Sequence, residues 1–277
     1  MIILLNGKFV PENRAVVSIF DRGFLYGDGL FETIRIVNGR PFRWEAHWKR
    51  LENGAKFLKI KLPMPGKKAR ALAEQLVVKN RMPDSLLRLA LSRGIGVRGY
   101  SPKNATHPTF AMTLHPAPEI GKQPVRWKLI TSSFRLPVGE PLAQFKTANK
   151  LPQILARAEA DAAGADEALL LNTDGFVVEG ASSNLFWIEH KTVCTPPLAA
   201  GILPGVTREI VQEICQRSKI AVREKSIRSK ALKRADGIFL SLTSWGIVEA
   251  KSLDGKGLKQ SPIIGRIAGR YNGWFLK

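Results

Sequence analysis

Three side chains with reactive chemistry stand in order within one stretch of the sequence, residues 146–207. Lys146 lies between a strand-like segment and a helix-like segment and offers an amine. Glu179 closes an apolar, strand-like run and offers a carboxylate. Thr207 follows the Pro204-Gly205 pair at the start of a helical pattern, where backbone N–H groups have no intrahelical partners. The stretch therefore offers an amine, an acid and an anion-binding helix start.

These are the three parts that a pyridoxal phosphate site requires. An amine must form a Schiff base, an acid must face the pyridinium nitrogen, and a helix N-terminus must hold the phosphate. Lys146 is flanked by Phe145 and Ala148, and an amine in such a half-apolar place can act as nucleophile and base. Lys150, one helical turn further on, is a rival. Helical spacing does not separate the two lysines.

The charge balance is the unusual bulk feature. The 277 residues include 43 Lys and Arg against 23 Asp and Glu, which gives a formal net charge of +20. The basic residues are spread along the chain, and their densest runs are short and not interleaved with aromatic residues. This pattern favours a solvated cationic surface that attracts a small anionic substrate over a surface that binds nucleic acid.

Metal and membrane functions have little support in the sequence. The four histidines are scattered, and Cys194 and Cys215 have no ligand spacing, so we expect no metal site. The apolar run at the N-terminus is too short for a signal peptide, and no later run is long enough to span a bilayer. We therefore expect a cytoplasmic protein that does not bind membranes.

The hydrophobic pattern mixes strands and helices through both halves of the chain. Predicted strands cover residues 2–5, 8–10, 31–37, 40–43, 86–92, 108–114, 125–131, 168–171, 176–179, 184–188, 220–224 and 238–242. Predicted helices cover residues 44–59, 66–80, 151–163, 206–215 and 263–275. Residues 16–20 are apolar and β-prone, whereas the glycine-rich segment 21–29 is expected to be a loop. This mixture indicates an α/β (α+β) protein of enzyme size.

A Pro- and Gly-rich segment, residues 115–121, is the expected domain linker. It divides the chain into a smaller N-terminal α/β domain, residues 1–117, and a larger C-terminal domain, residues 118–277. On this division the lysine that binds the cofactor belongs to the C-terminal domain.

Four motifs resemble those of a known family. They are Y-G-D-G-L-F-E-T-I-R at 26–35, H-W-K-R-L at 47–51, V-E-G-A-S-S-N-L-F at 178–186 and L-P-G-V-T-R at 203–208. The chain resembles the class IV pyridoxal-phosphate enzymes (fold type IV), which include branched-chain aminotransferase, D-amino-acid aminotransferase and aminodeoxychorismate lyase. The resemblance runs from the first hairpin to about residue 255. It implies two α/β domains with pyridoxal 5′-phosphate between them, and a homodimer.

The resemblance also assigns roles to individual residues. It implies that Lys146, which stands directly before the helix, carries the Schiff base in preference to Lys150. It implies that Glu179 faces the pyridine nitrogen and that Leu203 packs on the ring. The implied phosphate site consists of Arg50, the amides of Val206 and Thr207, and Thr243.

Thr33 distinguishes the members of this family. Branched-chain aminotransferases have glycine after the Phe-Glu pair, D-amino-acid aminotransferases have an aliphatic residue, and the lyases have threonine. The segment S-R-G-I-G-V-R-G-Y-S at 92–101 is also similar to the lyase pattern. The D-amino-acid enzymes bind a carboxylate with an Arg-x-His pair and a tyrosine. Here Arg98 is kept, but Tyr100 stands at the histidine position and Phe31 at the tyrosine position.

The resemblance therefore points to 4-amino-4-deoxychorismate lyase, which makes 4-aminobenzoate and pyruvate for folate biosynthesis. Lys146 would act as the base, Thr33 would act beside the leaving group, and Arg98 and Tyr100 would hold carboxylates. The alternative is a class IV transaminase that acts on branched-chain or D-amino acids with a 2-oxo acid as acceptor. A basic nucleic-acid-binding protein is a third and weaker hypothesis.

Overall fold

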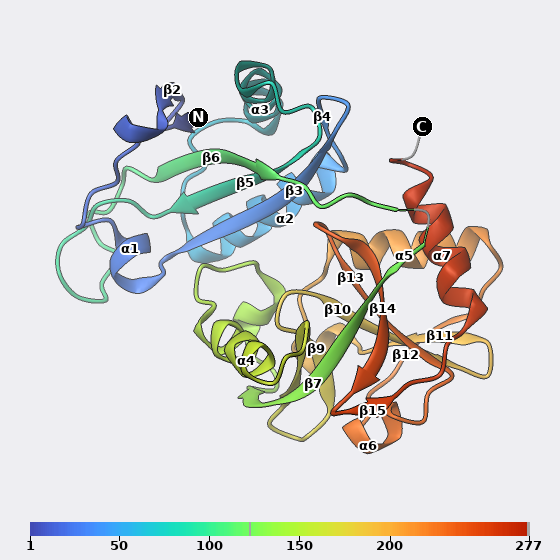
Figure 1. Ribbon diagram of the computed structural model, residues 1–277. Helices are drawn as coiled ribbons and strands as arrows, with labels where there is room; N and C mark the ends of the chain where they lie inside the picture. Colours follow the sequence, from blue (N-terminus) through green and yellow to red (C-terminus); the bar gives the residue numbers. More distant parts are fainter. Residues whose placement is uncertain (122, 276–277) are drawn as a thin grey trace. The chain divides into compact units, whose positions relative to one another are not determined.

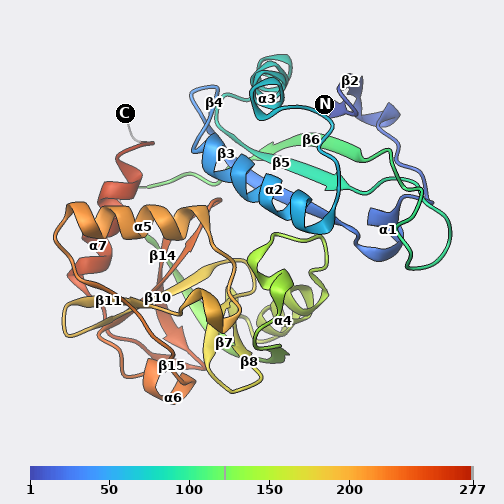
Figure 2. The ribbon, with the colours of Figure 1, turned by 180° about the vertical axis from the view of Figure 1, so that it is seen from behind.

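The computed structural model describes residues 1–121 and 123–275, which form two compact units. Residues 1–118 and 145–149 make up the first unit, and residues 119–144 and 150–277 make up the second. Figures 1 and 2 show both units from opposite sides. The mixed α/β fold class expected from the sequence is confirmed.

The first unit is built on a six-stranded antiparallel sheet with the strand order β2-β1-β6-β5-β3-β4. Its strands are β1 (Ile2–Leu5), β2 (Lys8–Pro11), β3 (Gly29–Val37), β4 (Arg40–Pro41), β5 (Ser85–Ser92) and β6 (Thr109–Pro116). The expected hairpin turns are confirmed: Asn6-Gly7 and Asn38-Gly39 all have positive φ angles, as such turns require.

Two long helices, α2 (Trp44–Leu58) and α3 (Gly66–Asn80), pack with this sheet (Figure 2). Alternation along a strand sends every second side chain to the same face. Leu30 and Ile34 of β3 join Leu51 and Ala55 of α2 in one core. Phe31 and Thr33 therefore point to the opposite face of the sheet, away from α2.

Residues 145–149 belong to the first unit, although their neighbours in sequence belong to the second. Backbone hydrogen bonds attach them to β3: the Phe31 N–H donates to the Lys146 carbonyl, and the Ala148 N–H donates to the Gly29 carbonyl, each at 2.9 Å. This differs from the division expected from the sequence, which assigned Lys146 to the C-terminal domain. A linker signal marks where the chain leaves a domain but not where a short segment returns to it.

The second unit contains a nine-stranded mixed sheet. Its strands are β7 (Val125–Leu136), β8 (Glu167–Asn172), β9 (Val177–Gly180), β10 (Asn184–Glu189), β11 (Thr192–Thr195), β12 (Val222–Glu224), β13 (Gly237–Leu242), β14 (Gly246–Leu253) and β15 (Lys256–Gly257). The sheet has the order β12-β11-β10-β13-β14-β7-β8-β9, and β9 also pairs with β10. That extra pairing closes the strands from β10 round to β9 into a ring.

The helices of the second unit are α4 (Leu151–Ala162), α5 (Val206–Arg217), α6 (Ser229–Leu232) and α7 (Pro262–Asn272). Helix α4 packs against β7 and β8, while α5 and α7 lie together beside β13 and β14 (Figure 2). The short 3₁₀ helices of the chain are η1 (Glu12–Arg14), η2 (Pro141–Gln144) and η3 (Leu198–Ala200). The helices expected near residues 151–163, 206–215 and 263–275 are confirmed with small shifts at their ends.

Two expectations for residues 16–29 were wrong. The glycine-rich segment contains a short helix, α1 (Arg22–Tyr26), because the Asp21 side chain accepts from the Gly23 N–H at 2.7 Å and caps its start. Gly27 then ends the helix in the left-handed conformation, with φ of 66°. The preceding run 16–20 forms no strand. Its apolar side chains lie on the surface, where Val16 is 77% exposed.

Candidate active site

Lys146 is held beside β3 by its own backbone. The isolated bridge between Leu30 and Thr147 places the lysine next to the strand, and the Lys146 Nζ lies 4.7 Å from the centre of the Phe31 ring. The residue before Lys146, Phe145, is held in place because its ring packs against the Phe57 ring with a centroid distance of 4.6 Å. The amine is thus presented on the sheet face that α2 does not cover.

Thr33 lies on this same face, because it is two residues beyond Phe31 on β3. The register of the sheet pairs Thr33 with Arg88 of β5. The Arg88 guanidinium lies over the Phe31 ring, with its Cζ 3.5 Å from the ring centre. One face of the sheet therefore carries an amine, a hydroxyl and a guanidinium around a single aromatic ring.

The opposite face of β3 carries a buried carboxylate, Glu32, which is 1% exposed. Arg50 of α2 donates to it through Nε and Nη2, both at 2.7 Å, and the His47 Nδ1 lies 2.7 Å from the same carboxylate. Burial alone would raise the pKa of Glu32, but Arg50 and His47 outweigh it and lower that pKa to about 2. Arg50 is thus held in a fixed orientation by a carboxylate that stays ionised.

His47 is itself buried and has a lowered pKa. Burial is the main cause, and the nearby charges of Arg50 and Lys146 act in the same direction, against the opposing effect of Glu32. The lowered pKa favours the neutral imidazole at neutral pH, which donates its Nδ1 proton to the Glu32 carboxylate.

Glu179 is positioned in the second unit by two donors. The Leu203 N–H donates to its Oε2 at 3.0 Å, and the Asn184 amide donates to the same oxygen at 3.4 Å. Asn184 also donates to the Leu203 carbonyl at 2.8 Å, so one amide joins the end of β9 to the segment that precedes α5. The structure therefore brings Glu179 and Leu203 together.

The start of α5 follows directly after this segment. Gly205 is the N-cap residue and provides no side-chain cap, so the first N–H groups of the helix lack a side-chain partner. A Cβ on Gly205 would clash with the Asn184 Oδ1, so a larger residue there would require the Asn184 side chain to move. Val206 and Thr207 occupy the first two helical positions. This geometry is suited to a phosphate at the helix N-terminus.

Two further hydroxyl groups lie at the end of β13. Thr243 stands in the turn directly after this strand and is half-buried. The Ser241 Oγ, opposite Asn184 in the register, is buried and has no hydrogen-bond partner among the described residues. A buried hydroxyl without a partner is uncommon in proteins and is what a polar ligand at this position would satisfy.

Arg98 and Tyr100 lie in the segment between β5 and β6, in the first unit. Tyr100 is 88% exposed, and its ring contacts the Tyr26 ring of α1 edge-on, with a centroid distance of 5.7 Å. The segment is attached to α1 by several hydrogen bonds rather than by regular pairing with a strand.

Sequence reasoning missed several residues that shape these groups: Glu32, His47, Arg88 and Asn184. Glu32 and His47 lie within the motifs that carried the resemblance, so strand alternation and helical spacing could have placed them facing each other. Arg88 could be found only from the register of β3 with β5.

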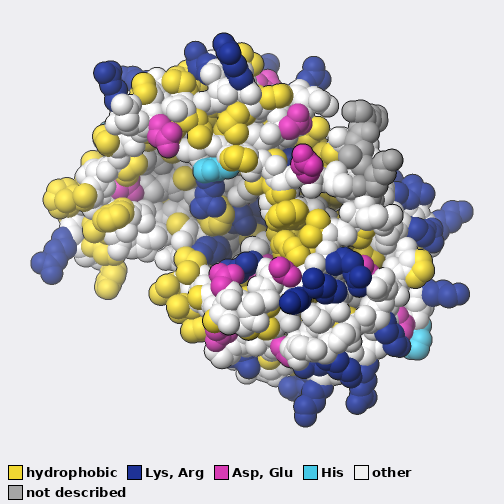
Figure 3. Space-filling model, in the orientation of Figure 1, with side chains coloured by type: hydrophobic (Ala, Val, Ile, Leu, Met, Phe, Trp, Pro, Cys, Tyr) yellow, Lys and Arg dark blue, Asp and Glu magenta, His cyan; other side chains and the backbone are white. Residues whose placement is uncertain are grey.

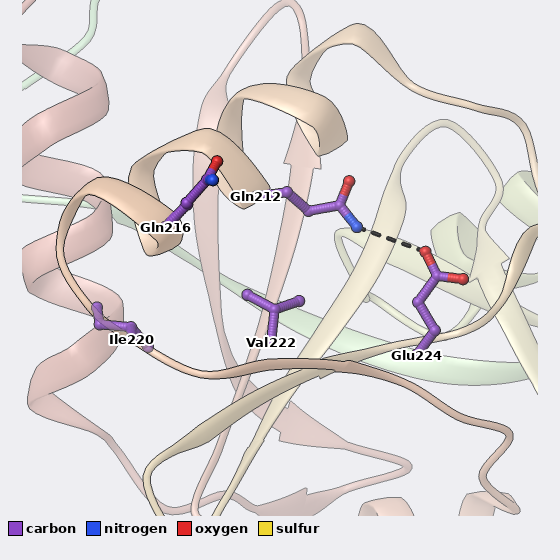
Figure 4. Close-up of a pocket in the computed structure, with 5 residues that line it drawn as sticks. All are labelled: Gln212, Gln216, Ile220, Val222 and Glu224. Atoms are coloured by element: carbon purple, nitrogen blue, oxygen red, sulfur yellow. Dashed lines mark hydrogen bonds between the residues drawn. The ribbon is translucent and has the colours of Figure 1, made fainter.

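A separate cavity of about 390 Å³ lies in the second unit between α5 and β12 (Figure 4). It is lined by Gln212, Gln216, Ile220, Val222 and Glu224. Its charged residue is already paired, because Arg208 donates to Glu224 at 2.6 Å. None of the residues predicted to bind cofactor or substrate lines this cavity.

Metal-binding clusters and membrane-spanning helices are both absent from the part of the chain that the structure describes. No group of three or more His, Cys, Asp or Glu side chains there could hold a metal ion. Among the helices of residues 1–121 and 123–275, none is long and apolar enough to cross a membrane.

Known proteins share this fold and sequence pattern. Residues 29–253 match the class IV amino-transferase family. A Methanocaldococcus jannaschii protein provisionally named as a branched-chain-amino-acid aminotransferase is 36% identical over 95% of this chain and 91% of its own length. The aminodeoxychorismate lyase of Bacillus subtilis is 32% identical over 86% of this chain and 82% of its own.

A solved structure of the T.th. branched-chain amino acid aminotransferase with pyridoxamine 5′-phosphate has a TM-score of 0.89. It is 27% identical and covers 99% of this chain and 97% of its own. The chain thus has the mixed α/β fold of pyridoxal-phosphate enzymes of fold type IV. The chain belongs to the class IV aminotransferase family, and the resemblance seen in its motifs is confirmed.

Proposed function

We propose that this pyridoxal 5′-phosphate enzyme is a 4-amino-4-deoxychorismate lyase, which releases 4-aminobenzoate and pyruvate in folate biosynthesis. The family and its cofactor define an enzyme that acts on a substrate amine. The threonine at position 33 and the lyase-like segment 92–101 favour the lyase within that family. The similarity to the Bacillus subtilis lyase supports the same assignment.

The residues present fit the cofactor. Lys146 would provide the amine and Glu179 a carboxylate partner for the ring nitrogen, and Leu203 would pack on the ring. Arg50, the Val206 and Thr207 amides and Thr243 would hold the phosphate. The close approach of Gly205 to Asn184 and the unpartnered Ser241 hydroxyl are both consistent with a bound polar group beside α5. When bound, pyridoxal phosphate supplies an aldehyde carbon and an electron-accepting ring.

Different residues of this chain then act on different positions of the substrate. The Lys146 Nζ removes the proton from the ring carbon that bears the amine. Thr33 donates a hydrogen bond to the ether oxygen of the enolpyruvyl group as its bond to the ring breaks. The leaving group takes up one proton and is released as pyruvate. Loss of the proton and of this group makes the ring aromatic, and 4-aminobenzoate remains.

The observation that carries this proposal is the shared sheet face of Thr33 and Lys146. Phe31 and Thr33 point the same way from β3, and the Lys146 amine lies over the Phe31 ring at 4.7 Å. A base and a hydroxyl can therefore reach two positions of one small ring. The cations Arg88 and Arg98, and Tyr100, would hold the two carboxylates of the substrate, which is a small dianion.

The decisive assay measures release of 4-aminobenzoate from 4-amino-4-deoxychorismate by the cofactor-loaded protein, beside a panel of amino acids with 2-oxo acids. Lyase turnover well above any transamination supports the proposal. Transamination without 4-aminobenzoate release contradicts it.

A class IV transaminase for branched-chain or D-amino acids is the second candidate. The similarity at 36% identity to the Methanocaldococcus jannaschii protein favours it. In that case Lys146 would return its proton to the cofactor rather than promote elimination. Mixing the loaded enzyme with an amino donor alone separates the two, because a transaminase converts the cofactor stoichiometrically to its amine form and a lyase does not.

We also propose a homodimer. Apolar side chains around α1 lie on the surface of the first unit (Figure 3): Val16, Ile19, Phe20, Phe24, Ile95 and Val97 are each more than half exposed. Large apolar side chains exposed in this number are typical of a protein interface. Analytical ultracentrifugation of the wild-type protein and of Phe24→Asp would test it.

We further propose a cytoplasmic location, with a small molecule rather than nucleic acid as the partner. The two cysteines, Cys194 and Cys215, are buried free thiols, which a reducing compartment preserves.

A further inference from the structure

We infer that Arg22 is a positioning residue for the substrate, because its guanidinium fixes the backbone of the segment that carries Arg98 and Tyr100. This inference rests on the proposed role of those two side chains in holding substrate carboxylates. Arg22 lies on α1, and its side chain donates to Asp28 and to the backbone of residues 99 and 100, so its effect on the reaction would pass through this segment.

All three nitrogens of the Arg22 guanidinium donate hydrogen bonds. Nη1 donates to the Gly99 carbonyl at 2.8 Å, and Nη2 donates to the Tyr100 carbonyl at 3.1 Å. Nε donates to the Asp28 carboxylate at 2.9 Å, which fixes the plane of the group. The residue is 3% exposed. A buried, fully bonded guanidinium thus joins two successive carbonyls to one carboxylate.

Other contacts attach the same segment to α1. The Gly99 N–H donates to the Tyr26 hydroxyl at 3.0 Å, and the Arg22 N–H donates to the Gly94 carbonyl at 2.9 Å. A Cβ on Gly96 would meet the Arg22 Cδ at 2.8 Å, so the glycine leaves room for the arginine side chain. The outer part of this segment is solvent-exposed and has no regular strand pairing, so these contacts set its backbone conformation.

A lysine at position 22 could not make these three hydrogen bonds at once. A guanidinium presents planar, divergent donors that can reach two carbonyls and a carboxylate together, whereas an ammonium is a single point charge on a flexible stem. Arg22→Lys keeps the charge beside Asp28 but loses the simultaneous hold on residues 99 and 100. The carboxylate-binding side chains would then sample several positions, and substrate binding would weaken more than the chemical step.

Arg93 provides a matched control. It pairs with the same Asp28 carboxylate, through Nε at 2.7 Å and Nη2 at 3.0 Å, and is also buried. Its remaining donors reach the carbonyls of Leu58 and Lys59 at the end of α2. Arg93→Lys therefore makes the same chemical change in the same ion-pair network without touching residues 98–100.

The experiment compares cofactor-loaded wild type, Arg22→Lys and Arg93→Lys by steady-state kinetics and by hydrogen exchange of a peptide spanning residues 95–101. We expect Arg22→Lys to raise KM by about tenfold with kcat within about twofold, and to speed exchange in this peptide by a similar factor. Arg93→Lys should leave KM and that exchange rate within about twofold of wild type.

Equal changes in the two variants, or a fall in kcat at constant KM for Arg22→Lys, would overturn the inference. If wild type releases no 4-aminobenzoate, the proposed function fails, but unchanged exchange in Arg22→Lys still refutes the positioning role by itself. If Arg22→Lys does not fold, Tyr26→Phe carries the test, because it removes only the hydroxyl that accepts from Gly99. Faster exchange at residues 95–101 is expected there too, and an unchanged rate contradicts the inference.

Discussion

Replacing Glu32 by glutamine should make the first unit less stable at neutral pH and less sensitive to acid. The pKa of Glu32 is lowered from an ordinary value of 4.5 to about 2, because Arg50 and His47 bind its ionised form. A lowered carboxyl pKa adds stability above the unfolded-state value, and this contribution is lost as the pH falls through the folded-state value. The window therefore runs from about pH 4.5 down to about pH 2.

The size of the effect follows from the pKa difference. A tenfold change in proton affinity corresponds to about 1.4 kcal/mol, so the ionised Glu32 contributes about 3 kcal/mol to the free energy of unfolding at pH 7. About 2 kcal/mol of this should be lost between pH 7 and pH 3 in the wild-type protein, and none of it in Glu32→Gln. His47, whose pKa is also lowered, makes both proteins less stable as the pH falls below its ordinary value of 6.5.

The assay is urea unfolding at pH 7 and pH 3. It is monitored by hydrogen exchange in peptides from β3 and α2, which report on the first unit. Glu45→Gln is the control: it makes the same chemical change in an exposed pair with Arg70. It should change the unfolding free energy by less than about 0.5 kcal/mol at both pH values. If the difference in unfolding free energy between wild type and Glu32→Gln is no smaller at pH 3 than at pH 7, the proposed charge state of Glu32 is wrong.

Three further outcomes are expected. Lys146→Ala should bind pyridoxal phosphate without the visible absorbance of a lysine-linked cofactor, and a retained band would move the assignment to Lys150. Thr33→Gly should lower 4-aminobenzoate release by about tenfold or more while cofactor affinity, measured by fluorescence titration, stays within about twofold; intact turnover would refute the lyase argument. Gly205→Ala should weaken cofactor binding and lower the unfolding free energy by about 1–3 kcal/mol in urea titrations, because its methyl group meets the Asn184 side chain; a neutral result would show that this contact relaxes freely.

The local elements of this protein were largely predictable from sequence. Apolar residues at helical spacing give α3 with the expected bounds, residues 66–80, and the Asn-Gly pairs mark the hairpin turns. The helix α1 was not predictable from composition, because the Asp21 cap outweighs the low helix propensity of its glycine. β14 was missed because polar residues interrupt its apolar pattern without a regular alternation.

The sequence by itself determined which chemical groups the protein has: the order of lysine, acid and helix start, the threonine at position 33, and the motifs that define the family. Only the tertiary structure decided that residues 145–149 join β3, that Arg50 is held by Glu32, and that Arg22 supports residues 99 and 100. The reason is physical. Periodicity and capping act between residues near in sequence, whereas these contacts join residues 18 to more than 100 positions apart and depend on strand register and packing.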